Sequence, residues 1–273
     1  MTLQNYFVVY PTSGLSDMLC VIDRCLEYAV KQNRLLIIDT EQNATNAWFL
    51  DTIHKYFHFT HPNIYTGNTT HIYTIIKDLS IFPKSRKGKL QEASRYYYML
   101  DLSNVYNERV LVNSCGGNMG RLPLQILKYI QLTPLVLDVY CERRKELPES
   151  YLGVHIRNTD RLSDVPAFLE ENQKIMTDNV FFLASDHYDT IESIRTLYPT
   201  MMTFSTIPDN NGKNIHTESR HIDRQECIID CIVDLMLLAS ATSLIYPNEN
   251  SGYTRIAKYL FENKPILNKI LLG

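Results

Sequence analysis

The feature that most constrains the fold of this chain is the alternation of short apolar runs with longer helical patterns. The apolar run Tyr6–Tyr10 is followed by the turn sequence Pro-Thr-Ser-Gly, by the helical pattern Leu15–Val30 and by the strand-like run Leu35–Asp39. This order is the signature of a βαβ unit, in which two parallel strands are joined by a helix. The chain is therefore expected to be an α/β protein built on parallel sheets.

The alternation breaks once and then restarts. At Glu146–Ser150 the sequence LPES interrupts the pattern, and strand and helix patterns resume from Tyr151 onward. A length of 273 residues suits two α/β domains of ordinary size. We expect an N-terminal Rossmann-like lobe over residues 1–147 and a C-terminal one over 148–273, with a ligand-binding cleft between them at the carboxyl ends of the strands.

Further elements follow from the same patterns. Strands are expected at Tyr96–Leu100, Arg109–Asn113, Tyr151–Ile156, Val180–Ser185 and Leu244–Tyr246. Helices are expected at Ala47–Phe57, Leu122–Ile130, Leu135–Lys145, Ala167–Met176, Tyr188–Leu197, Asp223–Ala239 and Ser251–Glu262. The polar segment Pro208–Arg220 is rich in Asn and predicts a mobile loop.

Composition excludes several classes of protein. A formal net charge of −3 leaves no basic surplus for binding nucleic acid, although the basic run Lys84–Lys89 precedes the aromatic segment Tyr96–Tyr98. No stretch approaches the roughly 18 apolar residues of a membrane span, and the N-terminus lacks the charged start and long apolar run of a signal peptide. The six cysteines contain no CxxC pair, which favours reduced, buried thiols and a cytoplasmic protein.

Four segments lie at predicted junctions between a strand and a helix. They are PTSGLSDML (Pro11–Leu19), GVHIRNTDR (Gly153–Arg161), FFLASDH (Phe181–His187) and VDLMLLASATSLIYPNENSGYTR (Val233–Arg255). Such junctions present backbone N–H groups and a helix N-terminus to anions, so a Gly or Ser with a nearby Arg predicts a phosphate site.

The second segment carries a family resemblance. His155-Ile156-Arg157-Asn158-Thr159-Asp160 resembles the H-x-R-R-x-D signature of the fucosyltransferase superfamily, which contains α1,2-, α1,6- and protein O-fucosyltransferases. The resemblance implies a GT-B fold, with Arg157 on the diphosphate of the donor and His155 beside the nucleotide. Asn158 stands where the signature has its second Arg, and this departure weakens the inference to GDP-fucose more than the inference to glycosyl transfer.

The other three segments resemble the same family in the same order. The segment from Ser13 resembles its Gly-rich first turn, here with Gly14, and FLASDH resembles its F-x-A-[ST]-D segment, here with Asp186. DLMLLASATSLI resembles the helix that carries a nucleotide-contacting Asp, here Asp234. NSGYTR resembles the turn that meets the phosphate, here Ser251, Gly252 and Tyr253. The implied function is an inverting, metal-independent transfer of fucose from GDP-fucose to a hydroxyl of a glycan or glycoconjugate.

The chemistry of the leaving group supports this interpretation. Departure of a nucleoside diphosphate builds negative charge, and metal-dependent transferases commonly hold a divalent ion at a D-x-D motif, which this sequence lacks. Arg157 and helix-terminal N–H groups are then the available stabilisers, and no metal or other cofactor is expected. A surface ion pair between Arg157 and Asp160 is the structural alternative.

The acceptor hydroxyl needs a group that takes its proton. Asp160 and Asp164 are the carboxylates closest in sequence to Arg157, and Asp17 in the first lobe is a third candidate. Asp160 could equally cap the following turn.

Other interpretations remain open. His54, His58 and His61 could bind zinc, and His216 and His221 are a weaker pair. A non-catalytic sugar- or nucleotide-binding module would use the same cleft without turnover, or the donor could be a different nucleotide sugar. CGGNMG (Cys115–Gly120) is the nearest approach to a Gly-rich nucleotide loop and is expected to be a turn before a helix near Leu122.

Overall fold

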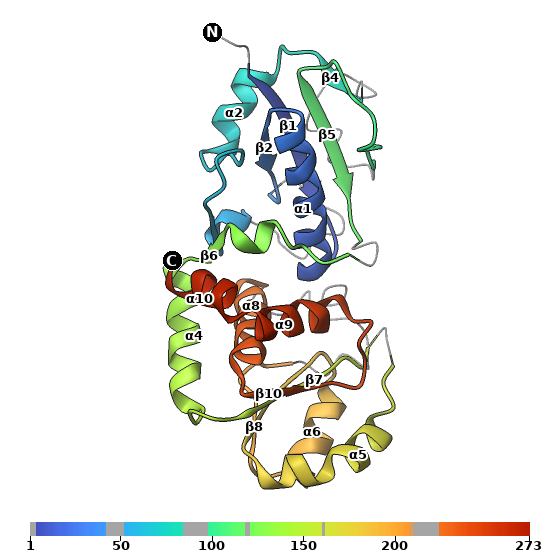
Figure 1. The fold of residues 1–273 in the computed structure, drawn as a ribbon, viewed down its shortest axis with the longest axis vertical. Helices are drawn as coiled ribbons and strands as arrows, with labels where there is room; N and C mark the ends of the chain where they lie inside the picture. The colour runs from blue at the N-terminus through green and yellow to red at the C-terminus, as the bar shows by residue number, and fades with distance from the viewer. Residues whose placement is uncertain are drawn as a thin grey trace. The chain divides into compact units, whose positions relative to one another are not determined.

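A computed structural model describes residues 4–41, 52–83, 98–117, 121–159, 162–207, 209 and 224–273. The chain divides into two compact units, Met1–Thr133 and Pro134–Gly273, each with its own parallel sheet (Figure 1). The predicted pair of α/β units is confirmed. Their boundary precedes the LPES break because the helix Pro134–Glu146 packs within the second unit.

The first unit has a four-stranded parallel sheet in the order β2-β1-β5-β4. Its strands are β1 (Asn5–Pro11), β2 (Arg34–Ile38), β4 (Ile81–Phe82) and β5 (Val110–Cys115), and its helices are α1 (Leu15–Lys31) and α2 (Thr69–Ile76). Alternate residues of β1 face opposite sides. Tyr6 and Val8 pack with α2, whereas Phe7 meets Tyr28 of α1, which explains why the strand reads as a continuous apolar run.

A small antiparallel pair of strands and two 3₁₀ turns lie where the described parts of two predicted helices end. The pair joins β3 (Phe57–Phe59) to β6 (Ile130–Leu132), and short 3₁₀ turns, η1 (Ile53–Lys55) and η2 (Ile126–Lys128), precede the two strands. The helix predicted at Leu122–Ile130 is therefore wrong. Tertiary contact is the cause, because the buried carboxylate of Asp23 in α1 accepts hydrogen bonds from the N–H groups of Gln125 and Ile126, both at 2.7 Å.

The helix predicted at Ala47–Phe57 is also wrong for residues 52–57, and its remainder lies outside the described residues. Of the predicted strand Tyr96–Leu100, Tyr98 forms an isolated antiparallel bridge with Ser114.

The second unit has a four-stranded parallel sheet in the order β10-β7-β8-β9. Its strands are β7 (Leu152–Ile156), β8 (Phe181–Ser185), β9 (Met201–Met202) and β10 (Ser243–Ile245). Its helices are α4 (Pro134–Glu146), α5 (Val165–Asp178), α6 (Tyr188–Leu197), α8 (Arg224–Ser240), α9 (Gly252–Glu262) and α10 (Lys264–Leu272). Figure 1 shows α5 and α6 on one face of this sheet and α8 with α9 on the other.

The predicted elements of this unit are confirmed to within one or two residues at most ends. The predicted mobile loop Pro208–Arg220 falls almost wholly outside the described residues, as do Asp160, His216 and His221. Within the described ranges, none of the helices is long and apolar enough to cross a membrane.

Candidate functional site

The carboxyl end of β7 and the start of α9 are tied together by His155. Its Nδ1 atom lies 2.7 Å from the hydroxyl of Thr254, and its ring lies against that of Tyr253 with 5.0 Å between the centroids. Burial and the nearby Arg157 lower the pKa of His155 to about 3, so the imidazole is neutral at physiological pH. The two predicted nucleotide-site segments are therefore adjacent.

The first turn of α9 presents backbone N–H groups at a capped helix start. Ser251 caps the helix, and its hydroxyl accepts a hydrogen bond from the N–H of Thr254. Gly252 and Tyr253 then occupy the first two helical positions, whose N–H groups have no carbonyl partner inside the helix. These N–H groups and the positive end of the helix dipole favour a bound phosphate.

Arg157 follows β7 directly and lies beside Asp186, which follows β8. The Nε atom of Arg157 is 3.9 Å from Oδ2 of Asp186, and about a quarter of the arginine side chain is exposed (26%). Asp186 is fixed in turn, since it accepts hydrogen bonds from the N–H of Asn158 at 2.8 Å and the hydroxyl of Thr159 at 2.6 Å. A carboxylate fixed by two hydrogen bonds thus lies within ion-pair distance of the guanidinium group.

Asn158 organises the loop instead of supplying a second cation. Its amide donates to the hydroxyl of Thr190, and its Oδ1 accepts from the N–H of Ser163, each at 3.1 Å. The hydroxyl of Ser163 donates to the carbonyl of Arg157 at 2.8 Å and closes the loop. The sequence signature did not single out Thr159, Ser163 or Thr190, because a lone hydroxyl carries no motif.

Asp234 is a buried carboxylate of α8 beside the same site. Ser205 donates to its Oδ2 at 2.6 Å and Arg143 lies 3.9 Å from its Oδ1, but that oxygen has no hydrogen-bond partner among the described residues. Burial raises the pKa of Asp234 to about 7, the Ser205 hydrogen bond opposes this rise, Asp230 adds to it and Arg143 opposes it. An unpartnered buried acceptor is a place for a ligand's N–H group.

Tyr253 connects Asp234 to the anion site. Its hydroxyl donates to the carbonyl of Cys231 at 2.7 Å, which joins α9 to α8 one turn before Asp234. The donor-site residues predicted in the second unit, namely His155, Arg157, Asp186, Asp234, Ser251, Gly252 and Tyr253, are thus linked through β7, β8, α8 and α9. Ser205, Arg143 and Asp230 complete the surroundings of Asp234 and were not predicted.

Asp164, Asp160 and Asp17 are the candidates for the catalytic base. Asp164 is exposed and caps α5, where its Oδ1 accepts a hydrogen bond from the N–H of Ala167 at 3.1 Å. Asp160 lies outside the described residues. Asp17 stands in the first turn of α1, in the first unit.

In the first unit, Gly14 begins α1 within a tight turn. Ser13 has a φ of 77°, and the turn lies against Gly116, where an added Cβ would be 2.3 Å from the Ser13 hydroxyl and 2.5 Å from that of Thr12. The described part of CGGNMG therefore packs on the Gly14 turn. No such contact surrounds Gly14 itself, where a Cβ would meet no described atom within 4 Å.

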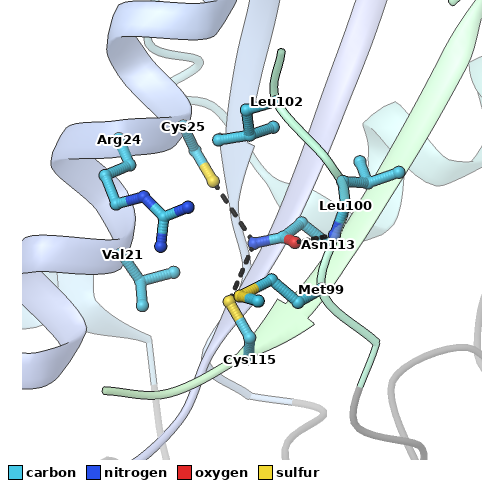
Figure 2. Close-up of a pocket in the computed structure, with 8 residues that line it drawn as sticks. All are labelled: Val21, Arg24, Cys25, Met99, Leu100, Leu102, Asn113 and Cys115. Carbon is cyan, nitrogen blue, oxygen red and sulfur yellow. Dashed lines mark hydrogen bonds between the residues drawn. The ribbon is translucent and has the colours of Figure 1, made fainter. Parts of the chain in front are cut away.

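Two thiols, Cys25 of α1 and Cys115 of β5, lie on either side of the Asn113 amide (Figure 2). The amide of Asn113 donates to the sulfur of Cys115 at 3.1 Å and to that of Cys25 at 3.4 Å, while its oxygen accepts from the N–H of Leu100 at 2.9 Å. No water-sized space remains among these side chains, so they are packing residues. The prediction of buried cysteines is wrong for Cys141, which is exposed, and Cys227 and Cys231 are only half-buried.

The histidines considered for zinc have other neighbours. The ring of His54 packs on Phe59 and that of His61 on Tyr129. Across the described part of the chain, no three His, Cys, Asp or Glu side chains gather as metal ligands would.

The fold is similar to that of solved fucosyltransferases. The chain matches fucosyltransferase NodZ from Bradyrhizobium with 16% identity and a TM-score of 0.64 over 94% of each chain. It matches POFUT1 in complex with GDP with 13% identity and a TM-score of 0.57, over 98% of this chain and 96% of that one. An α-1,6-fucosyltransferase NodZ crystal soaked with GDP-fucose matches with 15% identity and a TM-score of 0.62, over 94% of this chain and 93% of that one. No protein-family model and no curated protein sequence matches the chain. The likeness shows the predicted GT-B type of α/β fold.

Proposed function

We propose that this protein is a glycosyltransferase that moves L-fucose from GDP-fucose to a hydroxyl of a glycan or glycoconjugate. The observation that carries the proposal is the convergence, in the second unit, of the Arg157 loop, the first turn of α9 and the buried Asp234 carboxylate. The fold adds support, because similar structures include a POFUT1 complex with GDP and a NodZ crystal soaked with GDP-fucose.

The diphosphate is assigned to Arg157 and the N–H groups of Gly252 and Tyr253. The guanidinium group forms charge-assisted, bidentate bonds with phosphate oxygens, and Asp186 restricts its orientation. Both groups meet negative charge that grows as the sugar leaves, so they stabilise the transition state more than the bound donor.

The base is assigned to Asp234. With a pKa of about 7, Asp234 is partly ionised at neutral pH, and a base that donates hydrogen bonds to it favours the ionised form. That form is an acceptor only, and guanine presents two adjacent donors, N1–H and N2–H₂, on one edge. Uracil presents a single N–H between two carbonyl oxygens, which a carboxylate would repel. The Oδ1 atom of Asp234 therefore favours a guanine nucleotide over a uracil nucleotide.

The reaction is inverting and needs no metal ion. The acceptor oxygen forms the new bond to C1 of the sugar as the bond from C1 to the diphosphate oxygen breaks. The acceptor's proton passes to a carboxylate, for which Asp164, Asp160 and Asp17 are the candidates. We further propose a cytoplasmic location, on the ground that the described cysteines are free thiols.

A thermal-shift panel of GDP, UDP, ADP and CDP tests the proposal. A ligand that binds only the folded protein raises its stability by RT ln(1 + [L]/Kd), about 2.7 kcal/mol at a hundredfold excess over Kd. GDP is expected to give the largest shift, and GDP-fucose is expected to be hydrolysed slowly and to transfer fucose when an acceptor is present. Stabilisation by UDP alone would point to another nucleotide sugar, and binding without any turnover would leave a nucleotide-binding module.

A further inference from the structure

A second hollow lies on the second unit, between α5 and the edge strand β10. Its volume is about 430 Å³, and its walls include Asp164, Phe168, Glu171 and Asn172 from the α5 side and Leu244 and Tyr246 from the β10 side. β10 is the first strand of the sheet, so α5 overhangs an edge that no further described strand covers. We call this hollow the α5–β10 groove.

The polar side chains on the α5 side of the groove accept hydrogen bonds and offer few. Glu171 is exposed and has no hydrogen bond or ion pair with any described residue, and Asp164 uses only Oδ1 for its capping bond. Asn172 uses its Nδ2 donor on the carbonyl of Phe168 at 2.8 Å, which leaves its Oδ1 acceptor for a ligand. The α5 side therefore suits a donor-rich group, while the β10 side adds the hydroxyl of Tyr246, whose ring centroid lies 5.8 Å from Nζ of Lys258.

The remaining lining is apolar and favours a sugar over a simple cation. Phe168 is buried, and the strand and the turn after it present the half-buried residues Leu244, Ile245 and Pro247. Sugar rings combine hydroxyl donors on their rim with C–H faces that pack on apolar and aromatic surfaces. An isolated ammonium group would use the carboxylates and leave this apolar wall uncovered.

Both walls of the groove are continuous along the chain with segments of the proposed diphosphate site. Asp164 follows Ser163, whose hydroxyl donates to the carbonyl of Arg157 at 2.8 Å. On the other wall, the chain continues from Tyr246 to Ser251, the cap of α9. Asp164, which lines the groove, is therefore the next residue in the chain after Ser163, which positions the Arg157 loop.

We propose that the α5–β10 groove binds a sugar ring of the acceptor glycan, so that the second unit contributes to acceptor recognition as well as to donor binding. The proposal rests on the proposed function, because it takes the donor to be a nucleotide sugar held by Arg157. Glu171 and Asn172 bind sugar hydroxyls, and the apolar wall packs against the ring.

Sugar binding is tested without turnover. Saturation-transfer NMR is recorded with lactose, maltose, cellobiose and chitobiose, each with and without GDP. The proteins compared are the wild type, Ala167→Trp, Glu171→Gln and the control Glu170→Gln. Ala167 is exposed and lines the groove, so tryptophan fills it, whereas Glu170 is a neighbour on α5 outside the lining. At least one sugar is expected to bind the wild type and Glu170→Gln, and binding is expected to fall about tenfold in Ala167→Trp.

Kinetics separates failure of this proposal from failure of the proposed function. Glu171→Gln replaces a charged acceptor by a neutral one, so the acceptor KM is expected to rise about three- to tenfold while GDP affinity and donor hydrolysis stay unchanged. Absence of sugar binding in the wild type, or undiminished binding by Ala167→Trp, overturns the groove proposal whatever the nucleotide does. If the wild type does not bind GDP, the proposed function is overturned instead.

Discussion

Replacement of Asp234 by asparagine should separate stability from nucleotide binding. The carboxylate is buried, and a rise of its pKa from 3.8 to about 7 corresponds to about 4 kcal/mol at roughly 1.4 kcal/mol per tenfold change in proton affinity. Between pH 3.8 and about 7, Asp234 is protonated in the folded protein and ionised in the unfolded chain. The free energy of unfolding of the wild type therefore falls as pH rises through this range. The asparagine side chain never ionises, and because its amide also lacks a full set of partners we expect a net gain of about 1–3 kcal/mol at pH about 8.

The same change should weaken GDP binding. Loss of charge-assisted hydrogen bonds to the base is expected to raise the Kd by about 10- to 100-fold, since such bonds contribute about 1.5–3 kcal/mol. Urea unfolding from pH about 4.5 to 8.5 measures the first effect, and titration calorimetry with GDP measures the second. A stability difference that does not grow with pH, or an unchanged Kd for GDP, would refute the reasoning.

A matched control is Ser205→Ala, which removes the hydroxyl that donates to Asp234 at 2.6 Å. This variant removes the hydrogen bond to Oδ2 and leaves that oxygen of the buried carboxylate without its donor, so it should lose about 1–3 kcal/mol at neutral pH. A gain in stability in both variants would show that burial of Asp234 is not the cause.

Four further outcomes are expected. Arg157→Ala should unfold at the wild-type temperature but lose about 10²–10³ in fucose transfer, with poor rescue by lysine; turnover within a few-fold of wild type would remove Arg157 from the mechanism. Transfer should survive EDTA, since the sequence has no D-x-D motif, and a strict need for Mn²⁺ or Mg²⁺ would contradict this. The ring protons of His155 should not titrate in NMR between pH about 5 and 8, because its pKa is lowered to about 3; its contribution to stability is then present above the unfolded pKa of 6.5 and is lost as pH falls below it. Gly116→Ala should cost about 1–3 kcal/mol in urea unfolding because its Cβ meets Thr12 and Ser13, whereas Gly14→Ala should be tolerated, and equal effects of the two would count against the packed turn.

The sequence predicts the second unit better than the first. Strands β7 and β8 are buried on both faces, so they read as apolar runs, and each is followed by a helix with an amphipathic pattern. The region Leu122–Ile130 has a similar apolar content, but its conformation is set by the Asp23 carboxylate, which lies 102 and 103 residues from its two hydrogen-bond donors. Local patterns cannot report such a contact.

The site shows the same division. Arg157, His155 and Ser251 were identifiable because motifs place them at junctions, where strand ends and helix starts present them together. The capping bond of Asp164, the loop-forming role of Asn158 and the pairing of Ser205 with Asp234 depend on side-chain directions, which sequence spacing does not fix. The choice of a catalytic base therefore stays a prediction.

The membership of α4 in the second unit bears on how the two halves of such a chain could be exchanged between proteins. Arg143 of α4 pairs with Asp230, and the hydroxyl of Tyr140 lies 2.8 Å from that of Ser240. A splice after Glu146 would strip these partners from α8 and leave Asp230 and Asp234 without their arginine. A splice between Thr133 and Pro134 keeps the helix with Asp230 and Asp234, so recombination at this junction would transfer the proposed nucleotide site together with the helix that supports it.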